Sequence, residues 1–419
     1  MKMKRLIFSS LGSNYSLQQI LLHFLQLLFP DFTAPARLRV RLAALFRVQD
    51  CKLVYKGRDA IEYTLRAYGI GKGDSVLTQA FACYAVEEGI RRAGATPQYV
   101  DLGKNTVNLT VKSLERAYEK CDKNHVKALL VEHMLGCPAD AIALREWCTQ
   151  KNILLIEDLA QGFGSVDAQG DLLGLHADAV VLSFGRDKIL DAVSGGAALL
   201  RTAPKVAVAV TGVVSWHVVV RELLYPALTF LIRGLHHFGI GGIIHWIAKK
   251  MQLVWSPTKT IVPMMAAMPK EYAALAENQL LALESQLAHR RELATHYFAV
   301  FSTAQSEAEN VNRISVLTSE EDIKNGSNLR FVITVPNPQL VIEKVSHAGI
   351  HIADRWYRFA VDGGMAGCDT VYENGSCPYA EKRAQTVLTL PTHRGIRAGD
   401  ARRIAHAIIS AVNAESGTS

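Results

Sequence analysis

A lysine and an aspartate stand at the ends of two apolar segments that are typical of buried strands. Lys188 closes the run Leu182–Lys188, which follows the apolar stretch Ala177–Leu182. Asp158 lies thirty residues upstream, just after the apolar run Ile153–Ile156. Open α/β sheets bind ligands at the carboxyl ends of their strands, so we expect both side chains to face one site.

An amine beside a carboxylate is the pair of protein groups that pyridoxal 5'-phosphate requires. The lysine forms a Schiff base with the cofactor, and the acid holds the ring nitrogen protonated so that the ring can accept electrons. The pair therefore predicts a cofactor site at this edge of the sheet. A purely structural role for Asp158 is the alternative at this point, because any α/β protein has aspartates at strand ends.

The elements that must position this pair alternate between short apolar runs and helical patterns. Strands are expected at 75–78, 97–101, 127–132, 153–157, 179–184 and 197–200, with helices such as 114–120 and 141–151 between them. This alternation predicts a mostly parallel sheet with helices on both faces. Farther along, the expected elements are a long helix at 272–301, strands at 331–335 and 386–390, and helices at 339–348 and 400–412. They predict a small C-terminal α+β domain.

These patterns divide the chain into four predicted parts. They are an N-terminal helical segment 1–50, a large cofactor-binding domain 51–204, an apolar basic insertion 205–262 and a C-terminal domain with its connecting helix, 263–419. Within the first part, residues 16–29 are expected to form an amphipathic helix that packs on the large domain and ends at Pro30.

The insertion differs in composition from the rest of the chain. Glu222 is the only acidic residue in 206–254, and each apolar run is shorter than the roughly 18–20 residues of a membrane-spanning helix. Trp216 and Trp246 with basic flanks fit contact with a membrane surface. Packing against a partner subunit or over the active site is the alternative, and it is slightly favoured because enzymes often bury such helices.

Composition excludes some classes of function. The 419 residues are 49% hydrophobic, enough for a large core, and the net charge is +7. Lysines and arginines are scattered without a stripe of basic and aromatic residues, so no nucleic-acid partner is expected. The seven cysteines are odd in number and widely spaced, which argues against a disulfide framework or a metal ribbon and for a reducing compartment. No metal is expected.

Several motifs, in order along the chain, resemble the DegT/DnrJ/StrS-type sugar aminotransferases. The resemblance runs from about Leu42 to the C-terminus apart from 206–262. The motifs are Gly57-Arg58-Asp59-Ala60, Gly71-Lys72-Gly73-Asp74, His133-Met134-Leu135-Gly136, Glu157-Asp158-Leu159-Ala160-Gln161, Ser183-Phe184-Gly185-Arg186-Asp187-Lys188 and Gly195-Gly196. The resemblance implies an α/β fold-type-I pyridoxal-phosphate transferase, with a mostly parallel mixed sheet in the large domain and a small α+β domain.

The resemblance also implies roles for individual residues. Lys188 would bind the cofactor and move the proton between substrate and cofactor, and Asp158 would hold the ring nitrogen. Gln161 would hydrogen-bond the ring 3-oxygen, and Ser183 the phosphate. The helix start Gly57-Arg58-Asp59 would supply further phosphate contacts through its backbone. Asp59 departs from the commonest family pattern, which has a small hydroxyl residue here.

Further residues are expected to line the site. Either Cys83 or Tyr84 would cover the ring face, with core packing of the aromatic residues as the alternative. The expected substrate contacts are His133, Tyr357 and His393, and for His133 a structural role is equally open. The family motif through which a partner subunit reaches the phosphate is not evident before the long helix.

The resemblance implies an aminotransferase that moves an amino group, expected from glutamate, to a keto group of a nucleotide-linked deoxysugar. A homodimer in the cytoplasm is implied, with polysaccharide or glycosylated-metabolite synthesis as the setting. The alternatives are a membrane-peripheral enzyme acting on a lipid-linked sugar, located at the inner face of the membrane through 206–254, and a regulatory relative that binds the cofactor without turnover.

Overall fold

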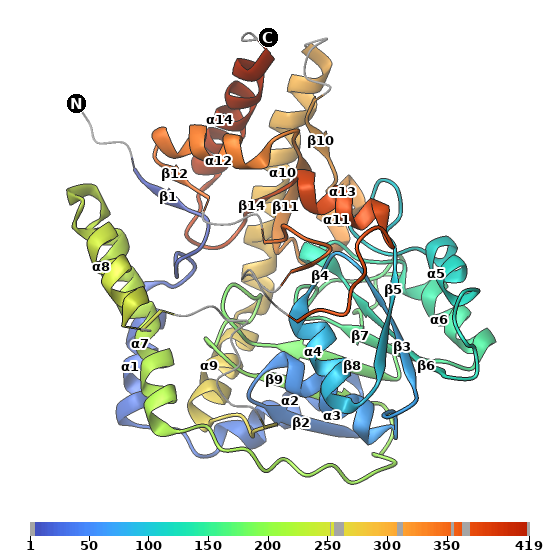
Figure 1. Cartoon of the computed structure of the whole chain (residues 1–419). Coiled ribbons are helices and arrows are strands. Elements are labelled where there is room, and N and C mark those ends of the chain that lie inside the picture. The colour runs from blue at the N-terminus through green and yellow to red at the C-terminus, as the bar shows by residue number, and fades with distance from the viewer. Residues whose placement is uncertain are drawn as a thin grey trace.

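The structure is a computed structural model that describes residues 5–251, 253–254, 264–307, 313–352, 356–362 and 369–416 (Figure 1). A large part contains the main sheet, a smaller part contains the C-terminal elements, and helix α10 (Leu283–Glu307) runs from one to the other (Figure 1). Helices α7 and α8 stand beside both at the left of the view.

A seven-stranded sheet with strand order β2-β9-β8-β7-β6-β3-β5 is the centre of the large part. Neighbouring strands are parallel except around β9, which runs antiparallel to both β2 and β8. The strands are β2 (Asp50–Val54), β3 (Ser75–Gln79), β5 (Thr96–Val100), β6 (Val126–Glu132), β7 (Leu154–Asp158), β8 (Ala179–Ser183) and β9 (Gly196–Leu200). The predicted α/β class with a mostly parallel mixed sheet is confirmed, and β2 is the strand that the sequence patterns missed.

Helices cover both faces of this sheet, because its strands are apolar on both sides. Along β6, Leu129 joins the core cluster that includes α2 and α6, whereas Leu130 joins the cluster that includes α3 and α4. This alternation is the period of two that a strand imposes on its side chains. The helices are α2 (Ala34–Phe46), α3 (Gly57–Ala67), α4 (Tyr84–Ala93), α5 (Val111–Tyr118), α6 (Ala141–Lys151) and α9 (Lys270–Leu281). The short 3₁₀ helix η1 (Met134–Gly136) follows β6.

The small part contains an antiparallel sheet of order β10-β11-β14. Its elements are β10 (Ser315–Val316), α11 (Glu320–Asn325), β11 (Arg330–Thr334), α12 (Pro338–His347), α13 (Pro378–Thr386), β14 (Val387–Pro391) and α14 (Ala398–Ser416). The predicted α+β elements are present. The prediction of a single helix at 272–301 is wrong in one respect. The backbone leaves helical geometry at Ala282, which separates α9 from α10.

Two short strand pairs connect parts of the chain that are distant in the sequence. Strand β1 (Ile7–Phe8) pairs with β12 (Ile350–His351), and β4 (Ala82–Cys83) pairs with β13 (Val361–Asp362). The first pair joins the N-terminal segment to the small part. The second joins the loop after β3 to the segment that contains Tyr357.

The N-terminal helix α1 (Leu17–Leu28) begins at a capping box formed by Ser16 and Gln19, and it contacts α7 and α9. The insertion forms α7 (Trp216–Gly234), the 3₁₀ helix η2 (His236–Phe238) and α8 (Ile240–Lys250). Within the described residues, no helix is long and apolar enough to cross a membrane. The four predicted domain ranges stay a prediction, and residues 255–262 of the insertion lie outside the described residues.

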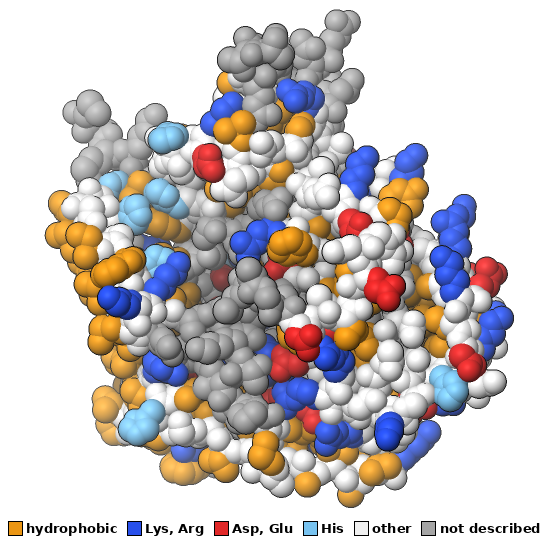
Figure 2. Space-filling view, in the orientation of Figure 1, with side chains coloured by type: hydrophobic (Ala, Val, Ile, Leu, Met, Phe, Trp, Pro, Cys, Tyr) orange, Lys and Arg blue, Asp and Glu red, His pale blue; other side chains and the backbone are white. Residues whose placement is uncertain are grey.

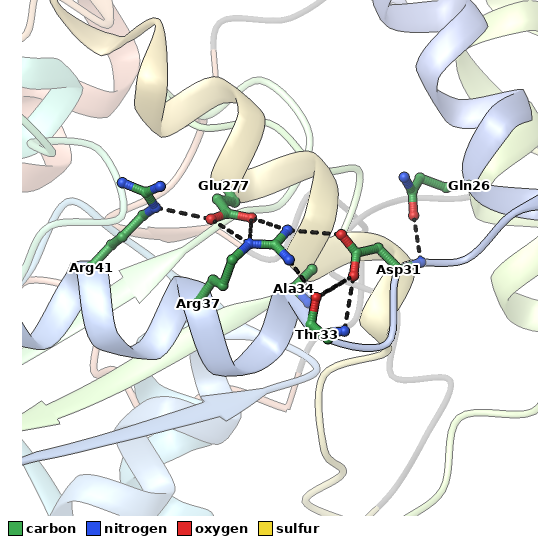
Figure 3. Close-up of polar contacts among 7 residues, drawn as sticks. All are labelled: Gln26, Asp31, Thr33, Ala34, Arg37, Arg41 and Glu277. Atoms are coloured by element: carbon green, nitrogen blue, oxygen red, sulfur yellow. Dashed lines mark hydrogen bonds and ion pairs between the residues drawn. The ribbon is translucent and has the colours of Figure 1, made fainter.

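Charged side chains fasten α2 to α9 (Figure 3). Glu277 on α9 accepts hydrogen bonds from Arg37 at 2.7 Å and from Arg41 at 2.9 Å. Arg37 also donates to Asp31 at 2.8 Å, in the turn that joins α1 to α2. The Glu277 side chain is only 7% exposed, so these ion pairs are partly shielded from water and hold the N-terminal helices on the large part.

Candidate active site

A cavity of about 350 Å³ lies at the carboxyl ends of the central strands. Asp158 ends β7 and Ser183 ends β8, and both line it together with Lys188. The start of α3 and the segment around Tyr357 close other sides. Lys188 and Asp158 thus share one cavity, at the sheet edge where α/β folds bind ligands.

Asp158 is buried and anchored. Its Oδ1 accepts a hydrogen bond from the Ala160 backbone N–H at 2.8 Å. Burial raises the pKa of Asp158, while the Ala160 hydrogen bond and the charge of Lys188 oppose that rise. A carboxylate held in this way can accept a hydrogen bond from a protonated ring nitrogen placed in the cavity.

The loop that positions Lys188 depends on Asp191, which sequence reasoning missed. The Lys188 Nζ lies 5.4 Å from the centroid of the Trp356 ring. Asp191 accepts from the backbone N–H of Asp187 at 2.8 Å and from that of Val193 at 2.9 Å. Its carboxylate also accepts from two N-terminal side chains, Tyr15 Oη at 2.5 Å and Asn14 Nδ2 at 2.6 Å. Burial raises the pKa of Asp191 to about 6, and these hydrogen bonds oppose the rise.

The start of α3 forms a cradle against Ser183. A Cβ built on Gly57 would lie 3.0 Å from the Ser183 Cβ and 3.3 Å from its Oγ, so only glycine leaves this space open. Lys56, the residue before the helix, makes no capping hydrogen bond with its side chain. Backbone N–H groups at a helix start bind anions, so this helix start and the Ser183 hydroxyl beside it offer hydrogen-bond donors for a phosphate group.

Gly196 allows the cradle to form, which gives a first prediction. A Cβ at Gly196 would lie 2.8 Å from the Lys56 carbonyl oxygen and 2.9 Å from the Gly57 nitrogen, both backbone atoms that cannot rotate away. We expect Gly196→Ala to destabilise the fold by about 1–3 kcal/mol and to weaken cofactor binding. Thermal unfolding and cofactor titration measure both effects. Gly399→Ala is the matched control for the loss of a glycine, because Gly399 lies exposed in α14, has no positive φ and has nothing within 4 Å of the added Cβ. Unchanged cofactor affinity in Gly196→Ala would contradict the cradle.

A buried polar cluster behind the cradle joins the insertion to the large part. Glu222 on α7 is 1% exposed and accepts hydrogen bonds from Tyr272 at 2.7 Å, Tyr55 at 3.1 Å and Lys56 at 3.2 Å. Burial lowers the pKa of Lys56, and Glu222 offsets part of that effect. The sequence marked Glu222 only as an isolated acid, because its partners lie 50 to 167 residues away.

The loss of this acid should be costly. We expect Glu222→Gln to lower the free energy of unfolding by about 1–3 kcal/mol, because it leaves the Lys56 ammonium, whose side chain is only 16% exposed, without a counter-charge. Urea unfolding measures the change. Glu292→Gln, at a side chain that is 61% exposed, should change stability by well under 1 kcal/mol. Equal effects of the two substitutions would mean that Glu222 does not stabilise the Lys56 charge.

Gln161 and Tyr357 meet at another side of the cavity. The Gln161 Nε2 donates to the Tyr357 hydroxyl at 2.7 Å, and its Oε1 accepts from the Leu135 N–H at 2.9 Å. The Nε2 group also lies 4.0 Å from the Met134 sulfur, a weak acceptor that a ring oxygen would replace. Both residues line the cavity, as do Gly57, Arg58 and Cys83.

The remaining predicted residues do not line this cavity. Asp59 pairs with Arg92 at 3.0 Å, and burial raises its pKa to about 6 against the Arg92 charge. The Tyr84 hydroxyl instead contacts the backbone oxygen of Asp369 at 3.5 Å, which leaves Cys83 as the neighbour of the cavity.

The two histidines predicted to touch substrate have structural partners. His133 accepts from the Ala139 N–H at 3.0 Å through Nδ1, so its Nε2 donates to Glu157 at 3.0 Å. His393 accepts from the Gly395 N–H at 3.1 Å and lies 3.0 Å from the Ser13 hydroxyl. Burial lowers the pKa of His393 well below its usual value. The structural alternative for His133 therefore has the stronger support.

Glu132 lines the cavity beside Asp158, and sequence reasoning missed it. It ends β6 in register with Asp158 on β7, so the two side chains project from the same face of neighbouring strands. Glu132 is 3% exposed, and its Oε1 has no hydrogen-bond partner within the described residues. Burial and the adjacent Asp158 raise its pKa well above the usual value.

Comparison with known proteins identifies the family. The model of the DegT/DnrJ/EryC1/StrS aminotransferase family matches residues 35–409, so the chain belongs to this family. It is 28% identical to the erythromycin biosynthesis sensory transduction protein EryC1 of Saccharopolyspora erythraea, over 81% of this chain and 80% of that protein. It is 25% identical to the UDP-2-acetamido-2-deoxy-3-oxo-D-glucuronate aminotransferase of Pseudomonas aeruginosa, over 90% and 89% of the two chains.

Solved structures share the fold. The structure of NtdA from Bacillus subtilis, described with bound cofactor PMP, superposes with a TM-score of 0.72 at 18% identity, over 99% of this chain and 86% of that one. An aminotransferase of this family from Brucella abortus gives a TM-score of 0.68 at 18% identity, over 94% and 95%. The predicted family, fold and aminotransferase class are confirmed.

Proposed function

We propose that the chain is a pyridoxal-phosphate-dependent aminotransferase that transfers an amino group, with glutamate as the donor, to a keto group of a nucleotide-linked sugar. The observation that carries the proposal is that Lys188, Asp158, Ser183 and Gly57 line one cavity. The residues fit the cofactor, because the cavity offers an amine, an acid for a ring nitrogen and a glycine cradle for a phosphate. The acceptor class is drawn from the nucleotide-sugar aminotransferase among the relatives.

The bound cofactor supplies an electron-accepting ring for the transfer of the amino group. Around it, this chain would position and move protons. Lys188 would take a proton from the donor carbon and return it to the cofactor carbon that receives the amine. Asp158 would keep the ring nitrogen protonated, and Gln161 would donate to the ring 3-oxygen. Ser183 and the start of α3 would fix the phosphate, so that the reacting atoms stay within reach of the Lys188 amine.

A regulatory role without turnover is the alternative that the name of the Saccharopolyspora relative raises. The family model, which is that of aminotransferases, favours catalysis. A lipid-linked acceptor has no specific support among the residues of the cavity.

Assembly and location complete the proposal. We infer a homodimer, in keeping with the family resemblance, and a cytoplasmic setting. The six cysteines in the described residues are unpaired, which agrees with the reducing compartment expected from the sequence.

The test has two stages. Glutamate alone should change the visible absorption of the purified, cofactor-loaded protein and release 2-oxoglutarate. Addition of UDP-linked 3-keto or dTDP-linked 4-keto sugars should then yield an amino sugar, detected by mass spectrometry. A protein that binds the cofactor but neither responds to glutamate nor aminates any of these sugars would favour the regulatory alternative.

A further inference from the structure

The outer side of the insertion is apolar. Helix α7 packs on α1, and α8 packs on α7, but large apolar side chains stay exposed along the outside of both. On η2 and α8, Phe238 is 71% exposed, Trp246 63% and Ile243 60%. Figure 2 shows hydrophobic side chains gathered along the left edge of the molecule, with histidines and basic side chains among them, where Figure 1 places α7 and α8. We call these exposed residues of 216–251 the α7–α8 face.

The charges on this face are of one sign. Lys249 and Lys250 at the end of α8 are exposed, whereas Arg233 on α7 donates inward to the Leu11 carbonyl oxygen. Glu222 is the only acid in 206–254, and it is 1% exposed because it pairs inward with Lys56. The described surface of the insertion therefore carries no exposed acidic side chain.

The neighbouring helix continues the pattern. Helix α1 contains no Asp, Glu, Lys or Arg. Its leucines Leu17, Leu21 and Leu28 are 67%, 58% and 71% exposed. It contacts α7. Exposed apolar patches on adjacent helices mark a binding surface of some kind rather than a random distribution of side chains.

We propose that the α7–α8 face docks on an anionic lipid bilayer, with α8 lying in the plane of the membrane surface. Apolar helices with tryptophans and a basic rim bind at the interface between headgroups and acyl chains. A second copy of the chain is a poorer occupant, because a two-fold contact would bring the same acid-free basic surface against itself. Helix α8 has 11 residues and spans about 16 Å, too short to cross a bilayer of about 30 Å.

Co-sedimentation with vesicles tests this docking independently of catalysis. The cofactor-loaded protein should sediment with vesicles of phosphatidylcholine and phosphatidylglycerol, and about tenfold more weakly with phosphatidylcholine alone or in high salt. The double variant Ile243→Ser, Trp246→Ser should lose about tenfold or more in binding. The charge-reversal variant Lys249→Glu, Lys250→Glu should lose its preference for the anionic vesicles. Val40→Ser on α2, where Val40 is 69% exposed, is the matched control and should bind like the unsubstituted protein.

The oligomeric state, measured by sedimentation without lipid, separates the two occupants. It should be the same for the unsubstituted protein and for the Ile243→Ser, Trp246→Ser variant. Dissociation of an oligomer by that variant would assign the face to a second copy and overturn the proposal, and so would a failure of the unsubstituted protein to bind anionic vesicles.

Discussion

Lys188→Ala should reduce transamination by about 10⁴-fold, the largest effect expected of any single substitution in the chain. The Lys188 amine lines the cavity with Asp158 and Ser183, and Ala leaves no group there to bind the cofactor covalently or to carry the proton. The variant should also lack the visible absorption band of a lysine-bound cofactor, while it still binds the cofactor through the phosphate cradle and Asp158. Absorption spectra and single-turnover assays measure the two losses separately.

Lys127→Ala is the matched control for this loss. Lys127 is exposed near the start of β6, at the opposite edge of the sheet from the cavity, and its substitution should leave both spectrum and rate unchanged. If the lysine-bound absorption band persisted in Lys188→Ala, another amine would have to be the attachment point. Lys56, which also lines the cavity, would then be the first to test.

The strands were predictable from the sequence because most of them are buried on both faces. Continuous apolar runs such as Leu154–Ile156 stand out, and their polar ends identify the site edge. Strand β2 escaped because only Leu53 and Val54 of its five residues are buried, and it lies at the end of the sheet. An edge strand with polar residues has no such apolar run.

The supporting residues could not be predicted, because their roles depend on partners far away in the sequence. Asp191 looks like an ordinary loop aspartate until Asn14 and Tyr15, more than 170 residues upstream, donate to it. His133 could be assigned only when Glu157 and the Ala139 N–H occupied both ring nitrogens. Local patterns identify the ends of strands, whereas contacts between distant segments decide which side chains are free to act.

Two carboxylates at one sheet edge raise the question of which one carries the charge that the site needs. Asp158 has the Ala160 hydrogen bond and the favourable charge of Lys188, whereas one oxygen of Glu132 lacks a partner within the described residues. Adjacent buried acids do not both ionise readily. We therefore expect Asp158 to be the ionised member of the pair and Glu132 the protonated one.

Asp158→Asn should consequently lower the transamination rate by about 100-fold or more, because an amide cannot hold the ring nitrogen in its protonated state. Glu132→Gln, which replaces a neutral acid by a neutral amide of the same shape, should stay within a few-fold of the unsubstituted enzyme. Rates with glutamate under single-turnover conditions compare the two variants, and cofactor titration checks that both still bind it. If Glu132→Gln were the slower variant, Glu132 would carry the charge and Asp158 would be its protonated neighbour. Comparison of the two rates thus identifies which of these two acids, in register on neighbouring strands, is the catalytic carboxylate.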